Sequence, residues 1–141
     1  MDFVVSEENV HLNFIYKSKS KMSQVKNDLS TRGDIKTLVD RFYEKVKSDT
    51  LLGPIFSHVD WPYHLPIMYN FWSSMLLGDQ TYQGNPLQKH LPLAIDRSHF
   101  DQWLILFRQT VDENFEGEKA EEVKMRAQSI AGIFQVKMGL R

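Results

Sequence analysis

Histidine can act both as a metal ligand and as an acid or base in this sequence, because it is the commonest metal ligand and titrates near neutral pH. The chain has five histidines, at positions His11, His58, His64, His90 and His99. No two of them have the four-residue helical spacing around a glutamate that marks metalloproteases. None forms a cluster with acidic residues at the spacing of a mononuclear metal site. Each histidine, considered alone, is therefore expected to be structural.

Other catalytic patterns are missing from the 141 residues. There is no G-x-S-x-G segment for a serine nucleophile and no glycine-rich loop for phosphate. Cysteine is absent, which excludes disulfides, thiolate metal ligands, iron–sulfur clusters and thiol nucleophiles. These observations weigh against a hydrolase and against a nucleotide-binding protein.

Two of the histidines lie near large apolar and aromatic residues, which suggests a site of another kind. His64 and His90 flank a segment dense in large apolar residues, and Tyr43 and Trp103 lie on the neighbouring predicted helices. An apolar slot with a few polar groups suits a flat hydrophobic cofactor. An imidazole can ligate a haem iron from one face, while hydrogen-bond donors on the other face govern the sixth ligand. A stripe of methionines and aromatic residues is also what an ordinary helical core requires.

Four amphipathic segments would position these residues. Asp34 is a good N-cap, and apolar residues recur after it at three- and four-residue steps, which predicts a helix of about four turns ending near Asp49. This stripe consists of Ile35, Leu38, Val39, Phe42 and Val46. A second helix is expected within 62–77, stopped by Gly78. Pro66 lacks an N–H, so the regular helix should begin at or after it, or its first turn should be distorted.

Two longer helices are expected to follow, over about 98–115 and 119–138. Residues 79–96 are expected to form a loop with a short helical turn, because Gly84, Pro86 and Pro92 interrupt regular helical structure there. No stretch shows sustained alternation of apolar and polar residues, so no sheet is predicted. The fold class is therefore all-α, with about four main helices around one core.

Length, composition and charge limit the number of domains, the class of protein and its possible partners. A chain of 141 residues fits one domain, and 42% hydrophobic with 25% charged residues is ordinary for a globular protein. A net charge of −1 gives no broad basic surface for nucleic acid. No apolar run is long enough to cross a membrane and the N-terminus does not resemble a signal peptide, so we expect a cytoplasmic protein. Residues 1–22 are expected to be an extension that precedes the domain at 23–141.

Several separate motifs follow one another along the chain. They are Phe-Tyr-Glu-Lys-Val at 42–46, Leu-Gly-Pro-Ile-Phe at 52–56, Asn-Phe-Trp at 70–72, Met-Leu-Leu-Gly at 75–78, Tyr-Gln-Gly-Asn-Pro-Leu-Gln-Lys-His at 82–90, Phe100 with Trp103, and Arg-Ala-Gln-Ser-Ile-Ala at 126–131. In this order and spacing they resemble the truncated haemoglobins, and most closely the third group of that family. The resemblance covers about residues 30–139.

The resemblance implies a two-over-two helical sandwich that encloses haem b. It makes His90 the proximal iron ligand, placed after a very short helix. On the opposite, distal side it places Tyr43, His64 and Trp103, and it places Phe56 against the haem ring. The other residues that it implies in contact with the cofactor are Met68, Phe71, Trp72, Leu87, Phe100, Phe107 and Phe134.

His64 departs from the family pattern. The distal histidine of the family lies on a regular helical turn, whereas His64 lies between Pro62 and Pro66. This setting can turn the imidazole out of the pocket. Orientation toward the pocket and orientation away from it are therefore equally compatible with the sequence.

Three functions are compatible with the resemblance. The leading one is binding of a small diatomic ligand, oxygen or nitric oxide, at the iron, with oxygen transport as one use. The second is a peroxidase-like or nitric-oxide-oxidising enzyme that draws electrons from an external reductase. The third is a haem-free sensor or interaction domain with a globin-like core, and the presence of His90 counts against it. The sequence leaves the oligomeric state open.

Overall fold

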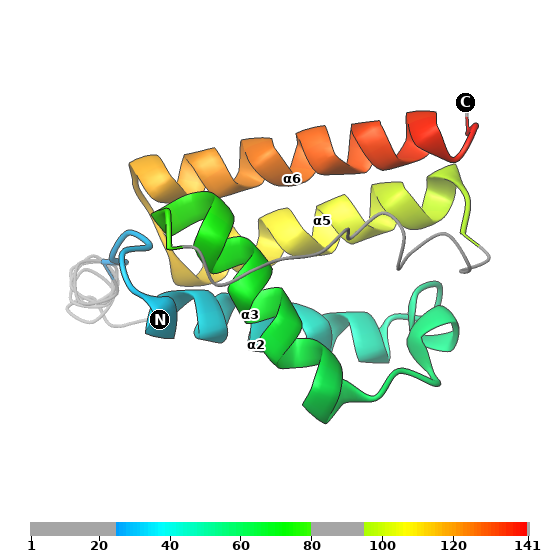
Figure 1. Cartoon of the computed structure of the whole chain (residues 1–141), viewed down its shortest axis with the longest axis horizontal. Coiled ribbons are helices and arrows are strands. Elements are labelled where there is room, and N and C mark those ends of the chain that lie inside the picture. Colours follow the sequence, from blue (N-terminus) through cyan, green and yellow to red (C-terminus); the bar gives the residue numbers. More distant parts are fainter. Residues whose placement is uncertain (1–24, 80–94, 141) are drawn as a thin grey trace, which may run out of the picture.

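The computed structural model describes residues 25–79 and 95–140. Within them the chain is helical and contains no strand, which confirms the predicted all-α class. The elements, labelled as in Figure 1, are α2 (Arg32–Ser48), the short 3-10 helix η1 (Gly53–Phe56), α3 (Trp61–Leu77), α5 (Arg97–Asn114) and α6 (Glu118–Lys137). None of these helices combines the length and the apolar character that a membrane crossing requires.

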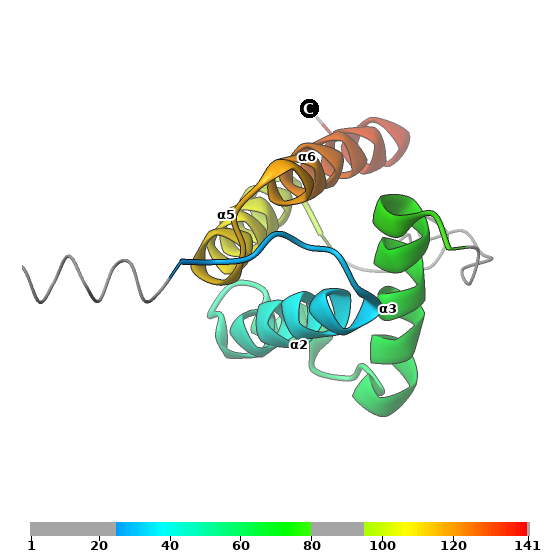
Figure 2. The same cartoon turned by 90° about the vertical axis from the view of Figure 1, so that its left-hand side faces the viewer.

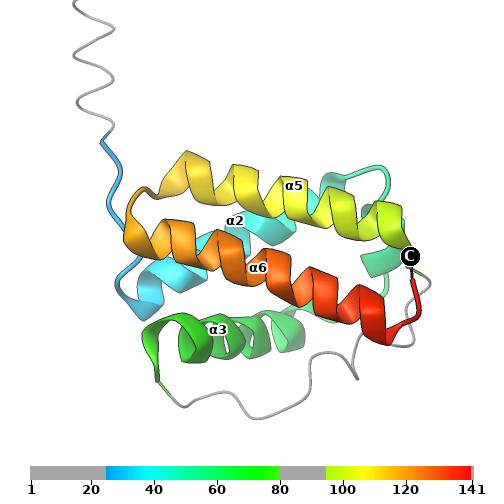
Figure 3. The same ribbon diagram turned by 90° about the horizontal axis from the view of Figure 1, so that it is seen from above.

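The helices form two pairs. α5 and α6 run side by side in opposite directions, and α3 crosses α2 on the other side of the molecule (Figure 1). An end-on view separates the α5–α6 layer from the α2–α3 layer (Figure 2). Seen from above, α6 lies between α5 and α3 in projection, with α2 behind it (Figure 3). This is the two-over-two arrangement that the resemblance implies.

The core lies between the two layers. The predicted apolar stripe of α2 is buried along its whole length. Phe42 on this stripe meets Phe107 of α5 edge to face, with the ring centroids 5.1 Å apart. Both phenylalanines are at most 1% exposed, and burying a side chain of this kind stabilises the fold by about 1.5–3 kcal/mol. Contacts of this kind fix α2 against α5 at the level of the pocket described below.

The start of α2 differs from the prediction. Its N-cap is Thr31 rather than Asp34, and the Thr31 hydroxyl accepts a hydrogen bond from the Asp34 N–H at 3.1 Å. The Asp34 carboxylate accepts a hydrogen bond from the Thr31 N–H at 3.0 Å. Asp34 is therefore the second half of a capping box, because the reciprocal pair satisfies two backbone N–H groups where a single cap would satisfy one.

Pro66 lies inside α3, so the expectation that the regular helix begins at or after this residue is wrong. The helix begins at Trp61, and the Asp60 side chain caps it by accepting a backbone hydrogen bond at 3.3 Å. The N–H that Pro66 lacks would have bonded to the carbonyl of Pro62 in the first turn. Both prolines are exposed, so water can bond that carbonyl instead. Gly78 ends the helix with a φ of 80°, as predicted.

Candidate functional site

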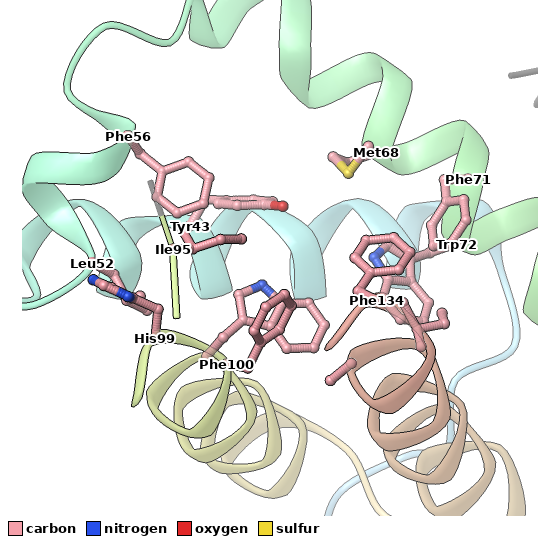
Figure 4. A pocket seen from close by; sticks show the side chains of 13 residues that line it. Tyr43, Leu52, Phe56, Met68, Phe71, Trp72, Ile95, His99, Phe100 and Phe134 are labelled. Carbon is pink, nitrogen blue, oxygen red and sulfur yellow. The ribbon is translucent and has the colours of Figure 1, made fainter. Parts of the chain in front are cut away.

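A pocket opens between the two layers of helices (Figure 4). Its walls come from all four long helices, from η1 and from the residues next to η1 and α5. The empty space between the walls measures about 670 Å³ when the open solvent at its mouth is included. Apolar side chains predominate, as is usual in sites that bind a cofactor. The lining residues are Tyr43, Leu52, Phe56, Met68, Phe71, Trp72, Ile95, His99, Phe100, Trp103, Ile130, Ala131 and Phe134.

Tyr43 brings a hydroxyl group into this apolar pocket. It follows Phe42 on α2, at the edge of the buried stripe, and its side chain is 4% exposed. The ring packs against Phe42 at 4.9 Å and against Phe56 at 6.3 Å, and Figure 4 shows the hydroxyl directed into the pocket. Burial raises the pKa of the Tyr43 hydroxyl well above its ordinary value. The group therefore stays protonated at neutral pH and can donate a hydrogen bond.

Trp103 on α5 lines the pocket and is held by an aromatic stack. Its ring lies 5.4 Å from the ring of Phe107 at an interplanar angle of 13°. Phe107 stacks in turn on Trp72 of α3, at 5.0 Å and 28°. Trp72 lines the pocket, whereas Phe107 is fully buried behind the two tryptophans and is not a lining residue. The structure thus brings Phe107 beside the predicted site as a support for its wall.

The other predicted contact residues divide into two groups. Five of them line the pocket, on η1, α3, α5 and α6, and these are Phe56, Met68, Phe71, Phe100 and Phe134. Leu87 and His90 lie outside the described residues. The described residues therefore form the part of the pocket that contains Tyr43, Trp103 and the apolar walls.

His64 lies beside the pocket rather than on its wall. Its imidazole meets the Tyr43 ring at 5.6 Å and the Trp61 ring at 5.5 Å, with interplanar angles of 78° and 75°. Its Nε2 atom is buried. His64 is not among the lining residues, so the structure places this side chain beside the pocket, packed against Tyr43.

Comparison with known proteins places this arrangement in a family. The sequence profile of the bacterial-like globins matches residues 27–134, which is most of the chain. The chain belongs to the bacterial-like globin family. A haem-based function follows for this globin, because the family binds haem and small diatomic ligands. The resemblance to truncated haemoglobins is likewise confirmed by individual relatives.

Relatives of this globin are similar in sequence and in structure. It is 40% identical to a group 3 truncated haemoglobin of Campylobacter jejuni over 108 residues, which cover 72% of this chain and 85% of that relative. The crystal structure of a group III truncated haemoglobin from Campylobacter jejuni matches with a TM-score of 0.75 and 37% identity, covering 81% and 95% of the two chains. A truncated oxygen-avid haemoglobin from Bacillus subtilis matches with a TM-score of 0.67 and 31% identity, covering 74% and 92%.

The side chains that line the described part of the pocket are chemically suited to a haem. Phe56, Met68 and Phe134 come from three different elements and give apolar walls for a flat hydrophobic ring. Tyr43 and Trp103 add hydrogen-bond donors to the same pocket. The donor set and the apolar walls are therefore those that a haem with a small ligand requires.

The structure adds to the globin pocket a residue with no predicted role. His99 lines it at the end where Leu52 lies (Figure 4). Its Nδ1 atom accepts a hydrogen bond from the backbone N–H of Asp96 at 3.0 Å, as part of the capping box that begins α5. One signal could have found His99, since it precedes Trp103 by four residues and so shares a helix face with it.

Proposed function

We propose that this globin holds haem b in the pocket, with His90 as the proximal iron ligand, and binds oxygen or nitric oxide on the side of Tyr43 and Trp103. The observation that supports this most is the buried hydroxyl of Tyr43 in a predominantly apolar lining. A ligand in this pocket would have few polar partners other than these side chains. Ferrous haem supplies the position at which a diatomic ligand binds.

Tyr43 acts as a hydrogen-bond donor to the bound ligand. Since burial raises the pKa of its hydroxyl, the proton remains on the oxygen throughout the physiological pH range. A hydrogen bond to a partly negative acceptor is stronger than a neutral one, and it gains further where water is scarce. Tyr43 should therefore favour a ligand that draws electrons from the metal, and oxygen does so more than carbon monoxide.

Trp103 gives a second donor in a fixed position. The indole N–H can donate but cannot accept, so it adds to the preference for a ligand with negative character. The parallel stack on Phe107 limits rotation of the indole. The two donors come from α2 and α5, which the core holds against each other, so their spacing is set by the fold.

Optical spectroscopy of the purified protein tests the haem part of this proposal. After haem is supplied, we expect a Soret band in the ferric and ferrous forms that shifts when carbon monoxide is added. His90→Ala should remove stable haem binding, whereas His58→Ala, at an exposed histidine away from the pocket, should leave the spectrum unchanged. A chain without a Soret band, or a His90→Ala variant with the wild-type spectrum, would overturn the assignment.

Ligand carriage and redox turnover are separated by a second measurement. For a carrier we expect slow oxygen dissociation from the ferrous protein and no sustained turnover of peroxide in the presence of an electron donor. Rapid peroxide turnover that depends on Tyr43 would replace carriage by an enzymatic function of the same pocket. The comparison uses the wild type and Tyr43→Phe under identical donor concentrations.

A further inference from the structure

Trp61 lies behind the distal wall of the pocket. It begins α3, is partly buried, and is not a lining residue. Its ring centroid lies 5.0 Å from that of Tyr43 and 5.5 Å from that of His64. Because Tyr43 and His64 are themselves 5.6 Å apart, the three side chains form a closed triangle of rings. Each ring in it touches both of the others.

Lys47 holds Trp61 from the outer side. Its Nζ atom lies 4.9 Å from the centroid of the Trp61 ring, which is the geometry of a cation–π contact. Lys47 follows Tyr43 by four residues on α2, so the two side chains project from the same face of that helix. Trp61 therefore bridges two successive turns of α2, with the distal tyrosine on one turn and the lysine on the next.

We propose that Trp61 is a positioning residue that fixes Tyr43 and His64 at the distal side, and that Lys47 stabilises Trp61 in this place. The inference rests on the proposed function, because it concerns how the donor of that site is oriented. The strength of a hydrogen bond falls steeply as its angle departs from linear. A phenol ring that loses a packing neighbour gains freedom to tilt, and its hydroxyl then donates less effectively to a bound ligand.

The anchoring of Trp61 favours this role over that of a general core residue. The Asp60 side chain accepts a hydrogen bond from the N–H of Tyr63 and fixes the start of α3. The Trp61 ring also lies 6.2 Å from the ring of Phe56, which lines the pocket. Within the described residues, the ring contacts of Trp61 are to Tyr43, Phe56 and His64, and its backbone lies at a capped helix end.

A double-mutant cycle tests the proposal on the haem-loaded protein. Trp61→Ala is compared with the wild type, and again in a Tyr43→Phe/His64→Leu background. In the wild type we expect oxygen dissociation to become about fivefold faster or more, and the infrared C–O stretching band of the carbon monoxide complex to broaden or split. In the double-variant background Trp61→Ala should change the oxygen dissociation rate less than about twofold, because the residues through which it acts are absent.

Matched variants separate positioning from general destabilisation. Trp61→Phe keeps an aromatic ring against Tyr43 and should restore most of the wild-type rate and band shape. Lys47→Met should raise the oxygen dissociation rate about two- to threefold, as expected for one exposed cation–π contact. Lys36→Met removes a lysine over another ring, that of Tyr69 at 5.5 Å, and should have no effect on either measurement.

The outcomes distinguish this inference from the proposed function. A wild-type chain that binds no haem overturns the proposed function. A haem-loaded Trp61→Ala variant with wild-type dissociation and an unchanged C–O band overturns the positioning role alone. The same holds if the effect of Trp61→Ala is fully retained in the Tyr43→Phe/His64→Leu background, because the tryptophan would then act without those two residues.

Discussion

The carboxylate of Asp28 accepts a hydrogen bond of 2.9 Å from the backbone N–H of Lys119, which lies 91 residues further along the chain. Its other oxygen accepts from the N–H of Ala120 at 2.8 Å. The residue at the N-cap of α6 is Gly117, which has no side chain to cap the helix. Asp28 therefore supplies from a distant segment the cap that α6 lacks, and α6 carries part of the pocket wall.

Removal of this cap should lower the stability of the whole fold. We expect Asp28→Ala to reduce the free energy of unfolding by about 1–2 kcal/mol, the usual cost of losing an N-cap side chain. Urea denaturation followed by circular dichroism gives this value. The control is Asp101→Ala, at an exposed position within α5, which should stay within about 0.5 kcal/mol of the wild type. An equal loss in both variants would argue against the cap.

The same carboxylate should contribute to loss of stability in acid. Burial alone would raise the pKa of Asp28, but hydrogen bonds from three backbone N–H groups and the charge of Lys119 outweigh it, so the pKa is lowered from 3.8. A group with a lower pKa in the folded state stabilises fully above its unfolded pKa and loses that contribution as pH falls through the folded value. We expect stability to be constant near neutral pH and to fall below about pH 5, less steeply in Asp28→Asn than in the wild type. An unchanged acid profile in Asp28→Asn would contradict this.

Two glycines next to and within α6 should respond to alanine in opposite directions. Gly117 has a φ of 140°, and a Cβ atom there would lie 2.5 Å from Cγ of Asp28, so Gly117→Ala should destabilise by more than about 1 kcal/mol. Gly132 lies inside α6 with open space where a Cβ would stand, so Gly132→Ala should stabilise by about 0.5–1 kcal/mol. Thermal unfolding of the two variants beside the wild type checks both signs. A stabilising Gly117→Ala would show that the capping segment can move aside.

Much of the fold could be predicted because it follows local periodicity. The stripe of α2 and the stop at Gly78 depend on residues close together in the sequence, and the structure confirms both. Of the two expectations for α3, a start at or after Pro66 was wrong, since the effect of Pro66 depends on whether the carbonyl one turn earlier can reach water. The cap by Asp28 could not be predicted, because nothing local relates it to a helix 91 residues away.

The pocket was predictable to a similar extent. Residues that lie on the apolar face of one helix, such as Phe100 and Trp103, are brought to the wall as expected. Phe107 lies on the same face but one layer deeper, and periodicity alone does not separate the two depths. The contact of Trp61 with Tyr43 joins two helices and depends on how they cross. His90 lies outside the described residues, and its role as iron ligand stays a prediction.

Tyr43→Phe should release oxygen faster than the wild type does. A hydrogen bond to a charged or partly charged acceptor contributes about 1.5–3 kcal/mol, which corresponds to roughly tenfold or more in the dissociation rate. Stopped-flow or flash-photolysis measurements give this rate, and the rate for carbon monoxide should change less. Tyr69→Phe is the control, because the hydroxyl of Tyr69 bonds to Asp40 rather than lining the pocket. Equal effects from the two variants would contradict a donor role for Tyr43.

His64→Leu should leave haem binding intact and alter ligand kinetics less than Tyr43→Phe does. His64 packs against Tyr43 and Trp61 without lining the pocket, and leucine keeps much of that packing. The lost ring contacts are worth about 0.5–1.5 kcal/mol, so the oxygen dissociation rate should change by less than about tenfold. Absorbance of the purified variant reports the haem content and flash photolysis reports the rate. Loss of haem from His64→Leu would show that this histidine supports the cofactor directly, contrary to the placement seen beside the pocket.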